Sequence, residues 1–102
     1  MKIIIPKNSL NENPEVWLRH AGYGLIFDRQ RGVQSFVRRL GSNFYPRIHL
    51  YVEDMGDNWN FNLHLDQKQA SYEGSHMHNA EYDSEVVVKE VERLKSMLLF
   101  TL

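Results

Sequence analysis

Cysteine is absent from this chain of 102 residues, and long apolar runs are absent as well. Without cysteine there can be no disulfide bond, no thiolate zinc site and no cysteine nucleophile. The opening MKIIIPKNSL has three consecutive isoleucines before Pro6, which is too few for the core of a signal peptide. No stretch approaches the roughly 20 apolar residues of a membrane-spanning helix. We therefore expect a soluble cytoplasmic protein that has no membrane partner.

The length fits a single domain, residues 1–102, which is large enough to form a hydrophobic core without metal or disulfide support. Hydrophobic residues make up 42% of the chain and charged residues 25%, as is ordinary for a soluble globular protein. Residues 19–47 contain six arginines and one acidic residue, whereas residues 48–102 contain ten acidic and four basic residues. This distribution predicts separate basic and acidic surfaces, provided that the fold keeps the two segments apart.

The clearest pattern in the sequence is a predicted β-hairpin over residues 47–66. Apolar and polar residues alternate in RIHLYVED and in NWNFNLHLD, which is the period of two that half-buried strands show. Gly56-Asp57 suits a two-residue type II′ turn, because glycine adopts a positive φ without steric cost. Counting back from this turn places Val52 opposite Phe61, Leu50 opposite Leu63, Ile48 opposite Leu65, His49 opposite His64 and Arg47 opposite Asp66.

A strand and a short helix are predicted near the N-terminus. The strand covers residues 2–5, and its three consecutive isoleucines suggest burial on both faces, hence a place inside the sheet rather than at its edge. Asn13 as N-cap and Pro14 at the first helical position predict the start of the helix, and Gly22 ends it.

A second hairpin is predicted over residues 23–40, with Gln30-Arg31-Gly32 as its loop and Gly32 in the left-handed conformation. This loop would place Leu25 opposite Val37 and Ile26 opposite Phe36.

A final helix is predicted from Asp83 or Ser84, because Val87, Val91, Leu94 and Leu98 recur at helical spacing. The tail MLLFTL is more apolar than one helical stripe needs. It is expected either to fold onto the sheet or to contact a second copy of the chain.

These elements predict an α+β fold. A mostly antiparallel sheet of about five strands, made of the N-terminal strand and two sequential hairpins, would be packed on one face by the C-terminal helix and the short N-terminal helix. The opposite, polar face would be open to water or covered by the loop that follows Asp66.

Four of the five histidines lie on the polar side of the central hairpin or in the loop after it: His49, His64, His76 and His78. Opposed strand residues have Cβ atoms about 5 Å apart, so His49 and His64 could share an ion that His76 or His78 completes. A divalent transition metal such as zinc would fit these ligands. No spacing matches a known metal motif, however, and the pattern favours hydrogen-bonded or surface histidines over a metal site.

A metal-free site is an alternative for the same residues. His49 and His64, with Asp66 to orient an imidazole, could transfer protons or activate water for hydrolysis. Further ligand contacts are expected from polar residues of the hairpin and the loop, namely Arg47, Tyr51, Asn62, Tyr72 and Glu81. The function so predicted is small-ligand binding in a His/Asp pocket on the polar face, with or without hydrolysis.

Two other functions remain open. The C-terminal helix and its tail, including Phe100 and Leu102, could form a non-enzymatic interaction or homo-oligomer surface. Arginines interleaved with aromatic residues could bind single-stranded nucleic acid, although Phe27 and Phe36 are better explained as core and the isoelectric point near 6.5 disfavours this function.

Overall fold

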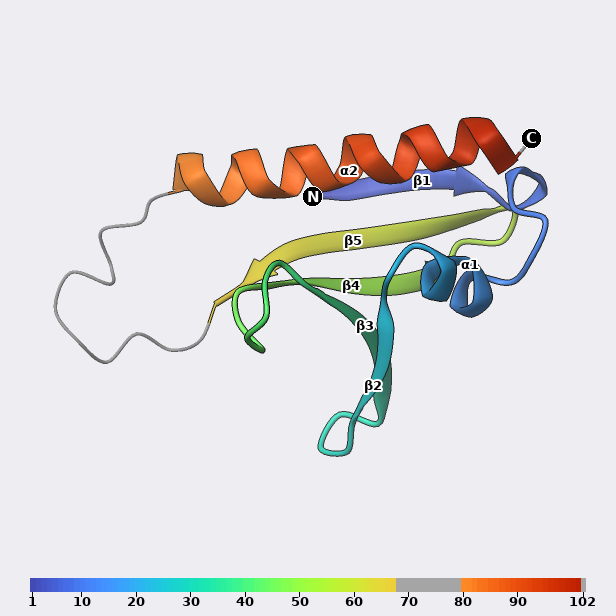
Figure 1. Cartoon of the computed structure of the whole chain (residues 1–102). Helices are drawn as coiled ribbons and strands as arrows, with labels where there is room; N and C mark the ends of the chain where they lie inside the picture. The colour runs from blue at the N-terminus through green and yellow to red at the C-terminus, as the bar shows by residue number, and fades with distance from the viewer. Residues whose placement is uncertain (68–79, 102) are drawn as a thin grey trace, which may run out of the picture.

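The protein is a five-stranded antiparallel sheet with two helices (Figure 1), which confirms the predicted α+β class. The structure is a computed structural model that describes residues 1–67 and 80–101, with side chains described for residues 1–67 and 84–98. The strand order is β1-β5-β4-β3-β2. The elements are β1 (Lys2–Pro6), a 3-10 turn η1 (Lys7–Ser9), α1 (Pro14–His20), β2 (Gly24–Asp28), β3 (Val33–Arg39), β4 (Arg47–Asp54), β5 (Asn58–Asp66) and α2 (Ala80–Thr101).

The β4–β5 hairpin has the predicted register at every position, including His49 opposite His64 and Arg47 opposite Asp66. The Met55 N–H donates to the Asn58 carbonyl at 2.9 Å, and Gly56 has a φ of 88°. Any side chain at Gly56 would be strained at this φ. The turn chemistry therefore sets the register along the whole hairpin.

The core lies between one face of the sheet and the two helices. Ile48, Leu50, Phe61 and Leu63 of the central strands are fully buried there. Trp17 and Leu18 of α1 and Val87, Val91 and Leu94 of α2 pack against the same cluster. The N-terminus of α1 is capped as predicted, since the Asn13 side chain accepts from the Val16 N–H at 2.9 Å. We call the opposite side of the sheet the polar face.

The prediction that the first strand lies inside the sheet is wrong, because β1 is an edge strand paired only with β5. Ile3 and Ile5 are buried under the helices, whereas Ile4 points to the polar face and is 55% exposed. A run of β-branched residues favours a strand, but it does not show whether that strand pairs with a neighbour on one side or on both sides.

The predicted register of the β2–β3 hairpin is wrong by one residue. Leu25 lies opposite Phe36 and Gly24 opposite Val37, so that the loop has four residues, 29–32, instead of three. The Asp28 carboxylate accepts from the backbone N–H groups of Gln30 and Arg31, an Asx turn that lengthens the loop. Gly32 is left-handed as predicted, with a φ of 66°.

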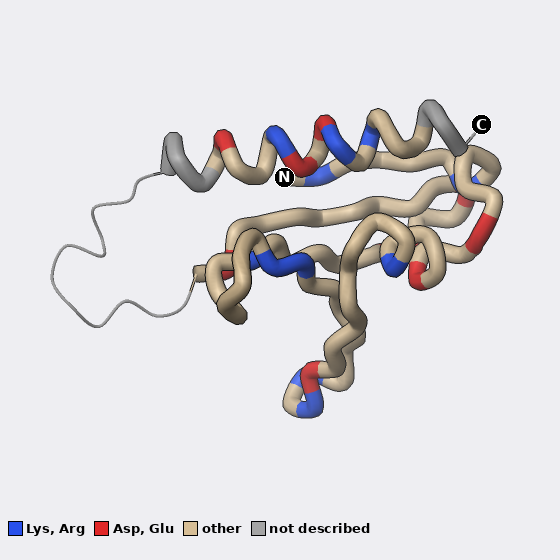
Figure 2. The backbone as a smooth tube through the Cα atoms, in the orientation of Figure 1, with Lys and Arg blue, Asp and Glu red and all other residues tan. Residues whose placement is uncertain are grey.

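The β2–β3 hairpin extends away from the rest of the sheet (Figure 1). Phe36 at its base is buried as predicted, but Phe27 near its tip is 57% exposed, so the prediction that Phe27 belongs to the core is wrong. The tip carries Asp28 together with arginines, and charges of both signs run along α2 (Figure 2).

A charged network that the sequence did not indicate joins α2 to the rest of the core. Glu90 is only 5% exposed. Its carboxylate accepts from the Tyr23 hydroxyl at 2.6 Å and twice from Arg93 at 2.8 Å, and Arg38 lies 3.5 Å away. Arg93 also donates to the Ala21 carbonyl at 2.7 Å. The carboxylate is therefore buried but fully paired.

The titration of this network follows from its contacts. Burial alone would raise the pKa of Glu90, but hydrogen bonds from Arg93 and Tyr23 outweigh it and hold the pKa below its ordinary value. Burial, together with the bond to Glu90, raises the pKa of the Tyr23 hydroxyl, which stays protonated as a donor.

We predict that Glu90→Gln lowers the free energy of unfolding by about 2–3 kcal/mol at neutral pH, because it leaves Arg93 and Arg38 without their partner. Tyr23→Phe should cost about 1.5 kcal/mol, as expected for a hydrogen bond to a charged acceptor. The control is Glu92→Gln, an exposed position of the same helix, which should change stability by less than about 0.5 kcal/mol. Urea unfolding measures all three, and equal effects of Glu90→Gln and Glu92→Gln would contradict the network's role.

Candidate functional site

The structure brings together all the predicted site residues of the hairpin whose side chains it describes. Alternation along β4 and β5 places their polar side chains on one face, and the register makes them neighbours: Arg47, His49, Tyr51, Asn62, His64 and Asp66. The ring centroids of His49 and His64 are 5.1 Å apart, and Tyr51 stacks on His49 at 4.6 Å. Tyr72, His76 and His78 lie outside the described residues, and so does the side chain of Glu81.

His49 is hydrogen-bonded to the protein through one ring nitrogen, and its other ring nitrogen lies near a carboxylate. Its Nε2 lies 2.8 Å from the Ser35 Oγ, and its Nδ1 lies 3.6 Å from the Asp66 Oδ2. Burial lowers the pKa of His49 below 6.5, and electrostatic repulsion between the two neighbouring imidazoles lowers it further, although Asp66 acts in the opposite direction. His49 is therefore a neutral residue that belongs to the protein's own hydrogen-bond network.

Ser35, His49 and Asp66 lie in the same order of atoms as a serine–histidine–aspartate triad. A nucleophile must reach its substrate, however, and Ser35 is only 2% exposed. Asp66 is also committed elsewhere, because its Oδ2 accepts from the Arg47 Nε at 2.9 Å. The arrangement therefore fixes His49 in place more readily than it activates Ser35.

Within residues 1–67 and the described part of α2, no three histidine, aspartate or glutamate side chains are placed to hold a metal ion together. The four-histidine site of the sequence prediction includes His76 and His78, so it falls outside the described residues and stays a prediction.

A hollow of about 400 Å³ lies on the polar face beside this cluster, and we call it the polar hollow. Its wall is formed by polar residues of β1, β4 and β5, namely Lys2, Tyr51, Glu53, Asn60 and Asn62, together with Val33, Gln34 and Val52 of β3 and β4. Two of the predicted ligand contacts, Tyr51 and Asn62, are among them.

Asn60 is the distinctive residue of the polar hollow. It is 4% exposed, and its Nδ2 donates to the Glu53 Oε1 at 3.1 Å. Its Oδ1 is buried and has no hydrogen-bond partner among the described residues. An unpaired buried acceptor costs about 1–3 kcal/mol, so a donor brought by a ligand would remove an existing penalty. The alternation along β5 places Asn60 on the polar face, but the sequence prediction did not include it among the ligand contacts, because alternation does not show that one amide of a row is buried.

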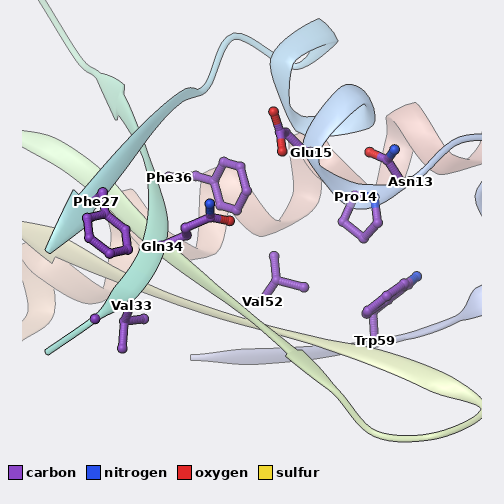
Figure 3. Close-up of a pocket in the computed structure, with 10 residues that line it drawn as sticks. Asn13, Pro14, Glu15, Phe27, Val33, Gln34, Phe36, Val52 and Trp59 are labelled. Carbon is purple, nitrogen blue, oxygen red and sulfur yellow. The ribbon is translucent and has the colours of Figure 1, made fainter. Parts of the chain in front are cut away.

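A second hollow of about 650 Å³ lies on the helix side, and we call it the hairpin groove (Figure 3). Phe27 and Val33 of the β2–β3 hairpin border it on one side, and Trp59 and the start of α1 border it on the other. Its lining is Asn13, Pro14, Glu15, Phe27, Gly32, Val33, Gln34, Phe36, Val52 and Trp59.

No comparison with protein families, curated proteins or solved structures found a match for the chain.

The helices within the described ranges are all too short or too polar to cross a membrane.

We predict that His49 lowers the free energy of unfolding in acid. Its pKa is lower in the folded state than the ordinary value of 6.5, so below that pH the unfolded chain binds a proton that the folded protein does not. The stabilisation is complete above about 6.5 and is lost as the pH falls through the lower pKa that His49 has in the folded state. His49→Gln should therefore show a shallower loss of stability as the pH falls below 6.5.

The same property can be read directly from the His49 ring protons by NMR titration. A midpoint below 6.5 is expected, and a midpoint at or above 6.5 would contradict the neutral, protein-held histidine.

Proposed function

We propose that the protein is a binding module that holds a small polar ligand in the polar hollow, and that His49 supports this site without transferring protons. The observation that carries the proposal is the buried, unpartnered Oδ1 of Asn60 in the wall of the hollow. Glu53 lies beside it. Two acceptors next to each other favour a ligand that carries N–H donors or a positive charge.

The histidine cluster restricts the motion of the side chains in the wall of the polar hollow. Tyr51, which lines the hollow, stacks on His49, and His49 is tied to Ser35. A wall whose side chains are already ordered loses less conformational entropy when a ligand binds. Water activation by His49 would need a free ring nitrogen facing the ligand, but its Nε2 lies 2.8 Å from the Ser35 Oγ. The metal-dependent version would need a third ligand, and the described residues place no such group of three together.

Nucleic-acid binding has less support. Arg38 turns to the helix side and meets Glu90, whereas Arg39 lies over the Phe44 ring at 4.1 Å and Arg47 over the Tyr45 ring at 4.6 Å. One face of each of these two rings is therefore already occupied by the protein's own guanidinium group. The homo-oligomer function through the tail stays a prediction, because the tail side chains after Leu98 lie outside the described residues.

The test uses N-acetylated, amidated arginine, lysine and glutamine as probes and follows their binding by NMR. We expect saturable shifts of Tyr51 and of the side-chain amides of Asn60 and Asn62, with a Kd of about 1 mM for the best probe, as suits one amino acid in a small open site. Asn60→Leu should abolish the shifts while leaving stability unchanged or higher, because it removes an unpaired buried acceptor.

Asn58→Leu is the matched control, since Asn58 lies on the same face of β5 but does not line the hollow. It should bind the probes like the natural protein. The proposal fails if none of the three probes causes saturable shifts at about ten times the expected Kd, or if Asn60→Leu binds them unchanged.

A further inference from the structure

The sheet is split between β3 and β4. These strands pair from Phe36 opposite Leu50 to Arg39 opposite Arg47. In the same register the next residues would be Ser35 opposite Tyr51 and Gln34 opposite Val52, but these are not paired. β3 instead continues with β2, and β4 continues with β5 as far as Asp54.

The backbone of β4 therefore has free hydrogen-bonding groups at the split. The Met55 N–H bonds to the Asn58 carbonyl, and along an antiparallel ladder hydrogen-bonded pairs recur at every second residue. Glu53 and Tyr51 then bond to β5, whereas Val52 and Asp54 direct their N–H and C=O groups toward β3. β3 supplies no partner for them within its described pairs. This part of β4 is a strand edge inside the sheet.

The split is open on both faces. Val33, Gln34 and Val52 line both the hairpin groove and the polar hollow, so the two hollows meet at the free edge of β4. The groove side presents Phe27, Phe36, Val52 and Trp59 (Figure 3). The polar side presents Glu53 and Asn60 next to the free edge, whereas the one cation of the lining, Lys2, lies on β1, two strands away from β4.

We propose that an extended peptide adds as a strand to the free edge of β4, with apolar side chains in the hairpin groove and basic side chains in the polar hollow. Successive side chains of a strand point to opposite faces, which matches one apolar and one acceptor-rich hollow. The basic side chains complement the Glu53 carboxylate and donate to the Asn60 Oδ1. This inference rests on the proposed function, for which it names the ligand class.

The edge strands of a second copy fit the split less well. The outward residues of β1 on the polar face are Lys2, Ile4 and Pro6, and its apolar partners Ile3 and Ile5 are already buried. β2 would bring Asp28 toward Glu53. Neither strand alternates apolar with basic residues, so the charge pattern favours a separate basic peptide.

The test is a capped peptide of about seven residues that alternates valine with lysine, titrated into the full chain. We expect a Kd of about 10–100 µM, at least tenfold tighter than the single amino-acid probes. Phe27→Ser should weaken binding about fivefold to tenfold. Leu25→Ser is the matched control, because Leu25 lies on the same face of β2, is also exposed and does not line the groove; it should bind like the natural protein.

Backbone pairing is tested with two versions of the peptide, one N-methylated on the odd-numbered amides and the other on the even-numbered amides. Alternate N–H groups of a strand point to opposite edges, so each version has one edge blocked. Only the version whose free edge faces β4 should bind, and equal binding of both would overturn the proposal. Equal weakening by Phe27→Ser and Leu25→Ser would overturn it as well. If sedimentation shows a dimer that Phe27→Ser dissociates and the peptide does not, the split belongs to a second copy and the proposal is wrong.

The outcomes separate this inference from the proposed function. Binding of single amino-acid probes without tighter peptide binding refutes the peptide alone. Peptide binding that Asn60→Leu leaves unchanged refutes the role of the polar hollow, which both proposals share.

Discussion

The reversal at Gly56 is the constraint on which the rest of the structure depends. Because the turn fixes which residues of β4 bond to β5, it also fixes which residues are left for the other neighbour. It directs the side chains of Ile48, Leu50 and Val52 toward the helices and those of Arg47 and His49 toward the polar face. A slip of one residue in the pairing of β4 with β5 would move every β4 side chain to the opposite face of the sheet. It would also turn the free backbone groups of Val52 toward β5.

Glu90 and Asn60, two of the three buried polar side chains among the described residues, differ in their hydrogen bonding. Glu90 joins α2 to Tyr23 and Arg93, and every strong acceptor position of its carboxylate is used. Asn60 is almost equally buried, but its Oδ1 has no partner among the described residues. A fully paired buried group specifies the packing of the fold, whereas an unpaired one carries a cost that only an additional donor removes. This difference is the reason why we propose the binding site at Asn60 and not at Glu90.

The central hairpin could be predicted from the sequence because all its determinants are local: alternation, a glycine turn and a consistent register on both strands. The β2–β3 register could not, because the Asp28 side chain competes for the loop N–H groups and adds a residue to the loop. The Glu90 network joins residues 67 positions apart, a distance at which periodicity carries no information. The split at Val52 could not be predicted either. Alternation predicts that a strand forms, but it does not show at which residue the pairing with the neighbouring strand ends.

The histidine pair shows the same limit at the level of the site. The sequence correctly placed His49 beside His64, but it could not show that Ser35 of another strand occupies the His49 Nε2.

Amide hydrogen exchange of the free protein tests the split at Val52 most directly. The amides of Leu50, bonded toward β3, and Tyr51, bonded toward β5, should exchange slowly, whereas the Val52 amide between the strands should exchange at a rate near that of an exposed loop. Protection of Val52 equal to that of Leu50 would mean that β3 closes onto β4, and there would be no free edge.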